Sequence, residues 1–433
     1  MDKMKIVWIC SLSNQEIRSR LLTRTSVLEP FFMKIVKRKF ERGIDTAIWN
    51  TNAINVIKDI PQVELHIVSP VRNLAIKRQD FSIDGIYYHF LRDENSALYK
   101  KVIRFLFTRF STEFKENRKN ICKVIEEIKP DLVHIIGAEN PQYSLALLDL
   151  PKTIPTLLQL QALLASIVDK VVGEQKKVFQ YKAEFEKQLI KRADYIGTCA
   201  PSFIEYIRKE IKAEAILVNT TLAMAQKIDL TETSKEYDFV HFAATLGPSK
   251  ATDIAIEAFG LAYKKHPEIK LDIIGGITDA FKEQLDKRIS KLGIQNAITF
   301  EGRLATHDDV IRQIRKSRFA LLPLKVSLVP NTLHEAMANG LPLVTTVTPG
   351  TPGLNTKRKS VLISPAGDFE DIAKNMVRLL EDEELGEELR QNAALTEHEA
   401  ENNTVIIKHW VDVYEAICRN KKDGVTIPNE FLL

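Results

Sequence analysis

Residues 321–345, LLPLKVSLVPNTLHEAMANGLPLVT, decide the fold of this chain. The stretch predicts a strand, a loop, a helix, a tight stop and a second strand. Pro330 can occupy the first turn of the helix, where a missing N–H has no consequence, and Asn331 or Thr332 can cap its start. Gly340 can end the helix in the left-handed conformation. A helix between two strands predicts a crossover connection in a parallel sheet.

The same alternation of short apolar runs and helical stretches extends through the rest of the chain. Helical stretches at 109–128 and 175–192 separate strands in the first half, and those at 249–265 and 281–292 do so in the second. The predicted strands are residues 5–10, 63–69, 86–91, 132–136, 156–160, 195–198, 215–219, 239–243, 271–274, 298–300, 319–322, 343–345 and 361–363. Strands separated by helices predict an α/β fold with parallel sheets that helices cover on both faces.

At 433 residues the chain is too long for a single hydrophobic core. The polar segment 223–236 lacks a strong apolar period and interrupts the alternation, so we place the linker there. We predict a first domain over 1–222, a second over 223–400, and a terminal segment, 401–433, whose helix around 402–419 crosses back to the first domain. Ligands of doubly wound folds bind at the carboxyl ends of the strands, which here predicts a site in a cleft between two domains.

The composition is that of an ordinary soluble protein, with 45% hydrophobic and 27% charged residues. No run of about 18 uncharged apolar residues predicts a membrane span. The four cysteines are scattered without metal-ligand spacing, and the apolar run 6–10 lacks the cleavage site of a signal peptide. These features favour a reduced cytoplasmic protein.

Positive charge is concentrated near the start of the chain. Residues 1–110 carry 19 Lys and Arg against 11 Asp and Glu, a local net of +8, so the remainder sums to +4 − 8 = −4. This excess favours an anionic partner, either a phosphate-bearing acceptor or the inner face of a membrane, but a solvated surface explains it equally well. The segment 96–114 mixes cations with large apolar residues. It either lies on an anionic membrane or packs on the core with a basic outer face.

Several chemistries are disfavoured by missing motifs. The first strand is followed by CSLSNQ at 10–15 rather than by Gly-x-Gly-x-x-Gly, which disfavours a dinucleotide oxidoreductase. Neither a Walker-type Gly-Lys-Ser/Thr loop nor an Asp-x-Asp metal motif occurs. We therefore expect no metal, no bound cofactor and no nucleic-acid partner.

The predicted helix at Pro330–Thr332 begins with free backbone amides, which together with the helix dipole favour an anion. Glu335 lies one turn further in, where its carboxylate can accept hydrogen bonds from vicinal hydroxyls such as those of a ribose. A plain crossover helix, with Glu335 as a solvated surface carboxylate, explains the same spacing.

The segment 335–344 resembles the signature of family 4 retaining glycosyltransferases, in which two glutamates with seven residues between them precede an Ala-Met-Ala-x-Gly-x-Pro run. That family has the GT-B fold, two Rossmann-like domains that face each other across a cleft. The resemblance implies that Glu335 holds the nucleotide ribose. It continues in Ser-Pro-Ala-Gly-Asp at 364–368 and in Thr-Leu-Gly-Pro-Ser-Lys at 245–250, which is similar to the loop whose Arg and Lys grip the donor diphosphate. The segments 8–10, 133–140 and 159–161 resemble bacterial surface-polysaccharide members.

The departures from this pattern affect the donor site. Ser327 stands where the family has its first glutamate, Thr245 where it has the diphosphate arginine, and Ala251 where it has a glycine, whereas Lys250 is kept. Lys325 or Arg303 can supply the missing positive charge, although either can equally be a surface cation. Ser327 keeps a hydroxyl but not a charge, which indicates either an unusual donor sugar or a chain that binds without catalysis.

In the first domain, polar residues follow the ends of predicted strands. Ser11, Ser13 and Asn14 follow the first strand, Glu139 and Asn140 the fourth, and Gln161 the fifth, where many family members place a His or Gln on the catalytic side. Glu139 can orient or activate an acceptor hydroxyl, or it can simply complement the dipole of the helix that follows. We expect His134 to be a core residue and His334 to face away from Glu335.

These features predict a metal-independent retaining glycosyltransferase of hexosyltransferase type. It would move a sugar from a nucleotide-diphosphate sugar to a saccharide or lipid-linked saccharide, in cell-surface polysaccharide assembly. The predicted catalytic residues are Lys250, Glu335, Glu139 and Gln161. Two alternatives remain open: a GT-B scaffold that binds a glycan or partner without turnover, and a sugar-nucleotide epimerase, which the Glu335 helix disfavours.

Overall fold

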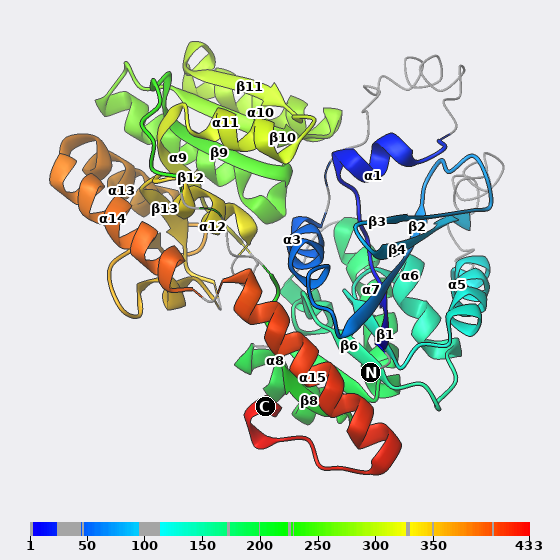
Figure 1. Cartoon of the computed structure of the whole chain (residues 1–433). Helices are drawn as coiled ribbons and strands as arrows, with labels where there is room; N and C mark the ends of the chain where they lie inside the picture. The colour runs from blue at the N-terminus through cyan, green and yellow to red at the C-terminus, as the bar shows by residue number, and fades with distance from the viewer. Residues whose placement is uncertain are drawn as a thin grey trace. The chain divides into compact units, whose positions relative to one another are not determined.

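The computed structural model describes residues 3–23, 45, 47–94, 113–170, 174–198, 200–223, 227, 229–325, 330–348, 350–400 and 402–433. The chain forms two compact units, each described here by itself (Figure 1). Unit 1 comprises Met1–Phe40, Thr46–Ala223 and Asn403–Leu433, and unit 2 comprises Glu41–Asp45 and Met224–Asn402. Within the described residues, no helix combines the length and the apolar character needed to cross a membrane.

Unit 1 contains an eight-stranded sheet in the order β3-β4-β2-β1-β5-β6-β7-β8. Its strands are β1 (Met4–Ile9), β2 (Val63–Val71), β3 (Arg78–Ile83), β4 (Ile86–Arg92), β5 (Leu132–Ile136), β6 (Thr156–Gln159), β7 (Tyr195–Thr198) and β8 (Ile216–Asn219). The apolar runs of β1 and β5 are almost fully buried, as expected for central strands covered on both faces.

The edge strand β3 corrects the expectation of purely parallel sheets, since it pairs antiparallel with β4. The two strands join through Asp84 and Gly85, which have φ values of 49° and 78°. Two consecutive residues with positive φ are what a tight type I′ hairpin turn needs, and Asp-Gly is a favoured sequence for it. β3 escaped prediction because its sequence, RQDFSI, is mostly polar and lies at the sheet edge.

The helices of unit 1 are α1 (Gln15–Arg20), α3 (Ile48–Ile57), α5 (Lys115–Ile128), α6 (Pro141–Ser144), α7 (Glu174–Arg192), α8 (Pro201–Tyr206) and α15 (Asn403–Asp423). α15, red in Figure 1, shares a core with β1 and β5. The Trp8 indole donates to the Tyr414 hydroxyl at 3.1 Å, and that hydroxyl donates to His134 Nδ1 at 2.7 Å. His134 is fully buried, and burial lowers its pKa to about 3, so it is a core residue as predicted.

Unit 2 contains a six-stranded parallel sheet in the order β11-β10-β9-β12-β13-β14. Its strands are β9 (Tyr237–Thr245), β10 (Leu271–Gly276), β11 (Ile298–Gly302), β12 (Ser317–Leu322), β13 (Leu343–Thr346) and β14 (Leu362–Ser364). In both units every predicted strand is present, with ends that differ from the prediction by at most two residues.

Helices cover both faces of this sheet, as a doubly wound fold requires. They are α9 (Thr252–Lys265), α10 (Asp279–Leu292), α11 (His307–Ile314), α12 (Asn331–Ala338), α13 (Phe369–Glu381) and α14 (Glu383–Glu399). One hydrophobic cluster joins the sheet to α9, α10 and α13, and another joins it to α11 and α12. The strand order reverses between β9 and β12, so the loops after these two strands diverge from a topological switch point, where ligands bind in such sheets.

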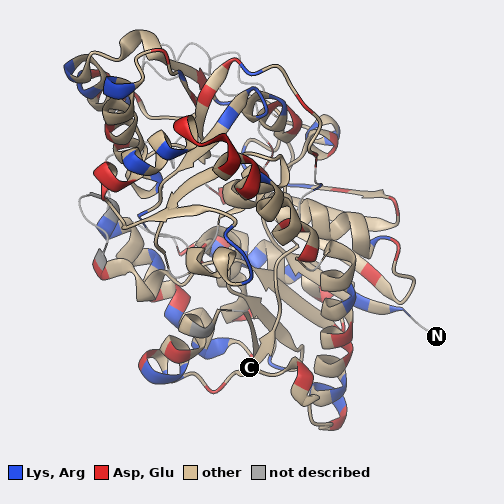
Figure 2. Cartoon of the chain, turned by 90° about the vertical axis from the view of Figure 1, so that its left-hand side faces the viewer, with Lys and Arg blue, Asp and Glu red and all other residues tan. Residues whose placement is uncertain are grey.

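The charge excess of residues 1–110 falls mainly outside the described residues. Of the 19 Lys and Arg, ten lie outside, leaving 19 − 10 = 9, and of the 11 Asp and Glu, three lie outside, leaving 11 − 3 = 8. Figure 2 shows cationic and anionic residues interspersed over the described elements. The predicted membrane segment 96–114 lies outside the described residues except at its last two positions, so that prediction stays open.

Candidate functional site at the carboxyl edge of unit 2

The start of α12 follows the switch-point strand β12. Pro330 is the N-cap residue, with φ −73° and ψ 152°, and no side chain among the described residues caps the helix. The expectation that Asn331 or Thr332 would cap it is therefore wrong. Pro330 already occupies the capping position, which moves both polar residues into the first turn. Gly340 has φ 70° and ends the helix in the left-handed conformation, as predicted.

Glu335 is buried on the second turn of α12, with 6% of its surface exposed. The alternative of a solvated surface carboxylate is therefore wrong. Burial raises the pKa of Glu335, and the nearby His307 and His334 lower it. None of the described residues donates a hydrogen bond to the carboxylate. Nδ1 of His307 lies 3.8 Å from its Oε1. A buried carboxylate without donors is an unusual arrangement that a ligand bearing hydroxyls would satisfy.

His334 faces away from Glu335, as predicted. Its Nδ1 lies 2.8 Å from Oε1 of Glu397 on α14.

Lys250 lies in the loop between β9 and α9, at the same edge of the sheet. Burial lowers the pKa of its ammonium group. None of the described carboxylates pairs with it. His241 on β9 packs beneath this loop. Its Nδ1 donates to the Leu321 carbonyl at 2.9 Å, and its Nε2 accepts from the hydroxyl of Thr252, at the start of α9, at 3.0 Å. A partly desolvated ammonium without an anion is suited to a phosphate.

Arg303 follows β11 and reaches across β10 to β9. Its Nη2 donates to the Thr245 hydroxyl at 2.9 Å and to the Ala244 carbonyl at 2.8 Å. The crossing depends on Gly276 at the end of β10, because a Cβ at that position would lie 2.6 Å from the same Nη2. Although Thr245 stands where the resembling family has an arginine, the structure brings a guanidinium to that residue from a different strand.

Lys325 lies beside this loop, but its charge is engaged elsewhere. Its backbone N–H donates to the Ser249 carbonyl at 3.4 Å, and its ammonium lies 3.2 Å from Asp253 on α9. Of the two predicted cations, Arg303 is the one that contacts Thr245. Ser327 lies outside the described residues.

In unit 1 the structure brings together Glu139 and Gln161, which follow neighbouring strands β5 and β6. The Gln161 amide donates to Glu139 Oε1 at 3.1 Å and accepts from the Trp49 indole at 2.8 Å. Asn140 donates to the same Oε1 at 2.7 Å. Glu139 Oε2 is buried with no hydrogen-bond partner among the described residues, and burial raises the pKa of this carboxyl.

Glu186 on α7 was missed by the sequence analysis. Its two carboxylate oxygens accept from the backbone N–H groups of Leu164 and Ala165, at 3.1 and 2.8 Å. Burial raises its pKa to about 7. Glu186 thereby fixes the loop that follows Gln161. A glutamate within a long polar helix gives no sequence signal of this contact.

The residues predicted after the first strand contact α1 and α3. Asn14 caps that helix by accepting from the Ile17 N–H at 2.9 Å, and the Ser13 hydroxyl accepts from Arg18 at 3.3 Å. Ser11 accepts through its carbonyl from Asn50 at 2.8 Å.

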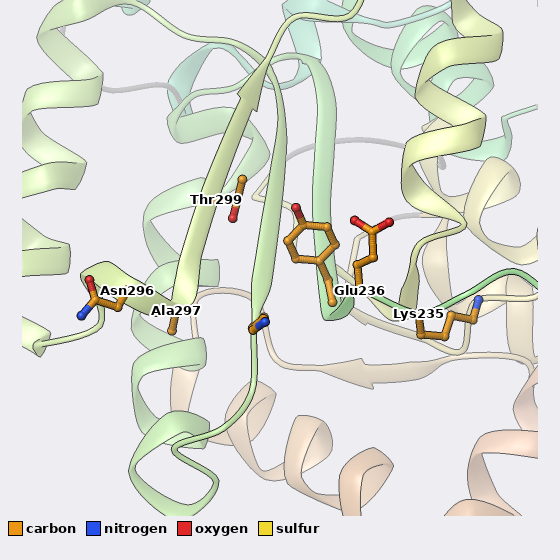
Figure 3. Close-up of a pocket in the computed structure, with 7 residues that line it drawn as sticks. Lys235, Glu236, Asn296, Ala297 and Thr299 are labelled. Carbon is orange, nitrogen blue, oxygen red and sulfur yellow. The ribbon is translucent and has the colours of Figure 1, made fainter.

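A hollow of about 500 Å³ lies at the amino ends of β9 and β11, lined by Lys235, Glu236, Asn296, Ala297 and Thr299 among others (Figure 3). It is at the opposite edge of the sheet from Lys250 and Glu335. Since ligands of doubly wound sheets bind at the carboxyl ends, we do not assign it to the site.

Sequence comparison relates this chain to proteins that act on sugars. Residues 226–396 match the family model described as "Glycosyl transferases group 1". The chain is 23% identical over 246 residues to the N-acetyl-alpha-D-glucosaminyl L-malate synthase of Bacillus anthracis, covering 54% of this chain and 63% of that protein. It is 27% identical over 146 residues to the mannosylfructose-phosphate synthase of Agrobacterium fabrum, covering 32% of each. The chain therefore spans less than two thirds of the length of these curated relatives.

Solved structures share the fold over nearly the whole chain. The sucrose-phosphate synthase of Thermosynechococcus elongatus has a TM-score of 0.67 at 14% identity, covering 95% of this chain and 98% of that protein. HepE of Anabaena, solved in complex with UDP and glucose, has a TM-score of 0.63 at 14% identity, covering 95% and 99%. These similarities confirm the predicted GT-B fold.

Proposed function

We propose that this chain, whose residues 226–396 match the family model of glycosyl transferases group 1, transfers a sugar from a nucleotide-diphosphate sugar to a saccharide or lipid-linked saccharide. The observation that carries the proposal is the buried carboxylate of Glu335 beside the start of α12, since no described residue donates to this carboxylate or caps the helix through its side chain. In this assignment the helix start receives the diphosphate, and Glu335 accepts hydrogen bonds from the ribose hydroxyls.

Lys250 and Arg303 are assigned to the diphosphate. Negative charge builds on the diphosphate as the sugar leaves, and positioned cations and amides stabilise it. Lys250 supplies a partly buried ammonium without a carboxylate partner among the described residues, and Arg303 supplies a guanidinium anchored at Thr245. We propose that these side chains carry out the charge stabilisation without a metal ion.

Glu139 and Gln161 are assigned to the acceptor. Glu139 has one oxygen engaged by Asn140 and Gln161, while the other has no partner among the described residues and is free to accept from an acceptor hydroxyl. Such a contact would orient the hydroxyl and favour loss of its proton during attack. We also propose that the mechanism is retaining and that the protein acts in the cytoplasmic assembly of cell-surface polysaccharide. The name of one relative, the exopolysaccharide phosphotransferase SCO2592 of Streptomyces coelicolor, supports the role in polysaccharide assembly.

The proposal is tested first by binding. UDP is the first probe because HepE was solved with it, and GDP, ADP and TDP complete the panel. Titration calorimetry should give a dissociation constant for at least one of them. We expect Lys250→Ala to weaken that nucleotide about tenfold or more, since a charge-assisted hydrogen bond contributes about 1.5–3 kcal/mol. Lys357→Ala, at an exposed lysine paired with Glu399, is the matched control.

Transfer is tested next with the corresponding nucleotide sugars. Release of the nucleoside diphosphate should fall roughly 10²–10³-fold in Lys250→Ala. If no nucleoside diphosphate binds, or if Lys250→Ala binds as tightly as Lys357→Ala, the donor site is wrongly assigned. Tight binding without turnover for any sugar would instead favour the non-catalytic binding scaffold, which the departure at Ser327 makes the second candidate.

A further inference from the structure

His307 contacts Glu335, and no sequence motif predicts this contact. It is the first residue of α11, whereas Glu335 lies on α12. Both helices start at the carboxyl edge of the sheet, α11 after β11 and α12 after β12, although β10 and β9 lie between these two strands. His307 Nδ1 lies 3.8 Å from Glu335 Oε1, which is longer than a hydrogen bond.

Two contacts fix the position of His307. Thr306 caps α11 and forms a capping box with Asp309, so the first turn of the helix is well determined. The His307 N–H donates to Oδ2 of Asp45 at 3.2 Å. Asp45 is far away in sequence but belongs to unit 2 by its contacts. A residue from the N-terminal part of the chain therefore contacts the first turn of the helix that carries His307.

Burial raises the pKa of Glu335, and His307 and then His334 lower it. His334 differs from His307 in its partner, since its Nδ1 lies 2.8 Å from Oε1 of Glu397. The side chain of Glu335 is 8% exposed and that of His307 is 22% exposed. His307 is thus the more accessible of the pair, which leaves it able to respond to a ligand at Glu335.

We propose that His307 is a positioning residue that makes Glu335 selective for a ribose over a deoxyribose. This inference rests on the proposed function, in which Glu335 accepts from the ribose. A buried carboxyl group on its own favours its neutral form, in which the protonated oxygen is a donor and a poorer acceptor for a ribose hydroxyl. His307 at 3.8 Å opposes this effect of burial, because it lowers the pKa of Glu335 and so favours the carboxylate, in which both oxygens accept. Because no hydrogen bond joins the two side chains, the ribose does not have to displace one.

The experiment compares UDP with 2′-deoxy-UDP, or GDP with 2′-deoxy-GDP if the protein binds GDP more tightly. The ratio of the two dissociation constants isolates the 2′-hydroxyl contact. We expect the wild type to prefer the ribonucleotide about tenfold or more, since the deoxynucleotide leaves a hydrogen bond to a charged group unmade. In His307→Ala this ratio should fall to roughly twofold, because Glu335 loses a side chain that lowers its pKa.

Two further variants separate the inference from the proposed function. His266→Ala, at a surface histidine beside Glu381, is the control and should keep the wild-type ratio. Glu335→Gln should bring the ratio close to one. If Glu335→Gln keeps the wild-type ratio, the ribose assignment itself fails. If it loses the ratio while His307→Ala keeps it, the proposed function stands and the role of His307 is overturned.

A purely structural role for His307 has a different signature. If His307→Ala weakened both nucleotides equally, the ratio would stay constant and the proposal would be overturned. His307→Gln covers the case in which His307→Ala does not fold, since it keeps the backbone contact to Asp45 and a side chain of similar length. Without a positive charge it should also lower the ratio several-fold. A wild-type ratio in His307→Gln would count against the proposal.

Discussion

At the scale of single residues, the position of Arg303 is decided by a residue without a side chain. Gly276 lets the guanidinium cross β10 and reach the hydroxyl of Thr245. A Cβ at Gly276 would lie 2.6 Å from Nη2 and 2.7 Å from Cζ of Arg303. These atoms belong to the far end of a flexible side chain, so the guanidinium can move away while the sheet stays intact.

Gly276→Ala should therefore affect ligand binding more than folding. We expect it to displace Arg303 from Thr245 and to weaken the nucleoside diphosphate about tenfold, with a shift of the melting temperature of less than about 2 °C. Calorimetry and thermal unfolding measure the two effects. Gly353→Ala is the control, because a Cβ there meets no atom within 4 Å. Equal affinity in the two variants would show that Arg303 does not contact the diphosphate.

At the scale of elements, the backbone at the start of α9 is strained because Ala251 replaces a glycine of the resembling family. Ala251 precedes the helix with φ 49° and ψ 34°, in the left-handed region, where the resembling family has a glycine. A residue with a Cβ costs about 1 kcal/mol there relative to glycine. Lys250 immediately precedes this residue, so the strain lies next to the proposed diphosphate contact.

Ala251→Gly should stabilise unit 2. Relief of the backbone strain outweighs the loss of one buried methyl group, and we expect a gain of roughly 0.5 kcal/mol in the free energy of unfolding. Ala258→Gly, in the middle of the same helix, should instead lose about 1 kcal/mol or more, because glycine there only adds flexibility to the unfolded chain and removes a buried methyl group. Urea unfolding of both variants gives the comparison. A loss of stability in Ala251→Gly would contradict the left-handed conformation.

At the scale of the whole molecule, each unit contains a buried histidine that stays neutral in the fold. Burial lowers the pKa of His134 in unit 1 to about 3 and that of His241 in unit 2 to about 4. An unfolded histidine has a pKa near 6.5. Between these values the unfolded chain binds protons that the folded chain does not, so stability is full above pH 6.5 and falls as the pH falls.

The contribution of His241 can be isolated by substitution. Because its pKa falls from 6.5 in the unfolded chain to about 4 in the fold, His241 accounts for a loss of about 3 kcal/mol of unfolding free energy between pH 6.5 and pH 4. His241→Gln can still bridge the Leu321 carbonyl and the Thr252 hydroxyl but does not titrate, so its unfolding free energy should fall less steeply in acid. His266→Gln, at a surface histidine beside Glu381, is the control. Identical acid slopes in wild type and His241→Gln would contradict a neutral His241.

Sequence patterns alone predicted the strands of both sheets apart from β3, the helices α5, α7, α9, α10, α12 and α15, and the place of Glu335 on the helix between β12 and β13. Apolar runs, helical periods and the Pro330 and Gly340 boundaries are local signals, and they act within a few residues. They did not predict the edge strand β3, because its sequence is mostly polar. The Asp84–Gly85 turn is recognised as a hairpin only once β3 is seen to pair with β4.

Which distant residues contact one another became clear only from the tertiary structure. Arg303 reaches Thr245 across Gly276, Gln161 meets Glu139, Glu186 holds the loop after Gln161, and α15 joins the core of unit 1. His307 meets Glu335 for the same reason. Each of these contacts joins segments far apart in the chain. They follow from strand order and register, which depend on the packing of the whole sheet and leave no pattern in any one segment of sequence.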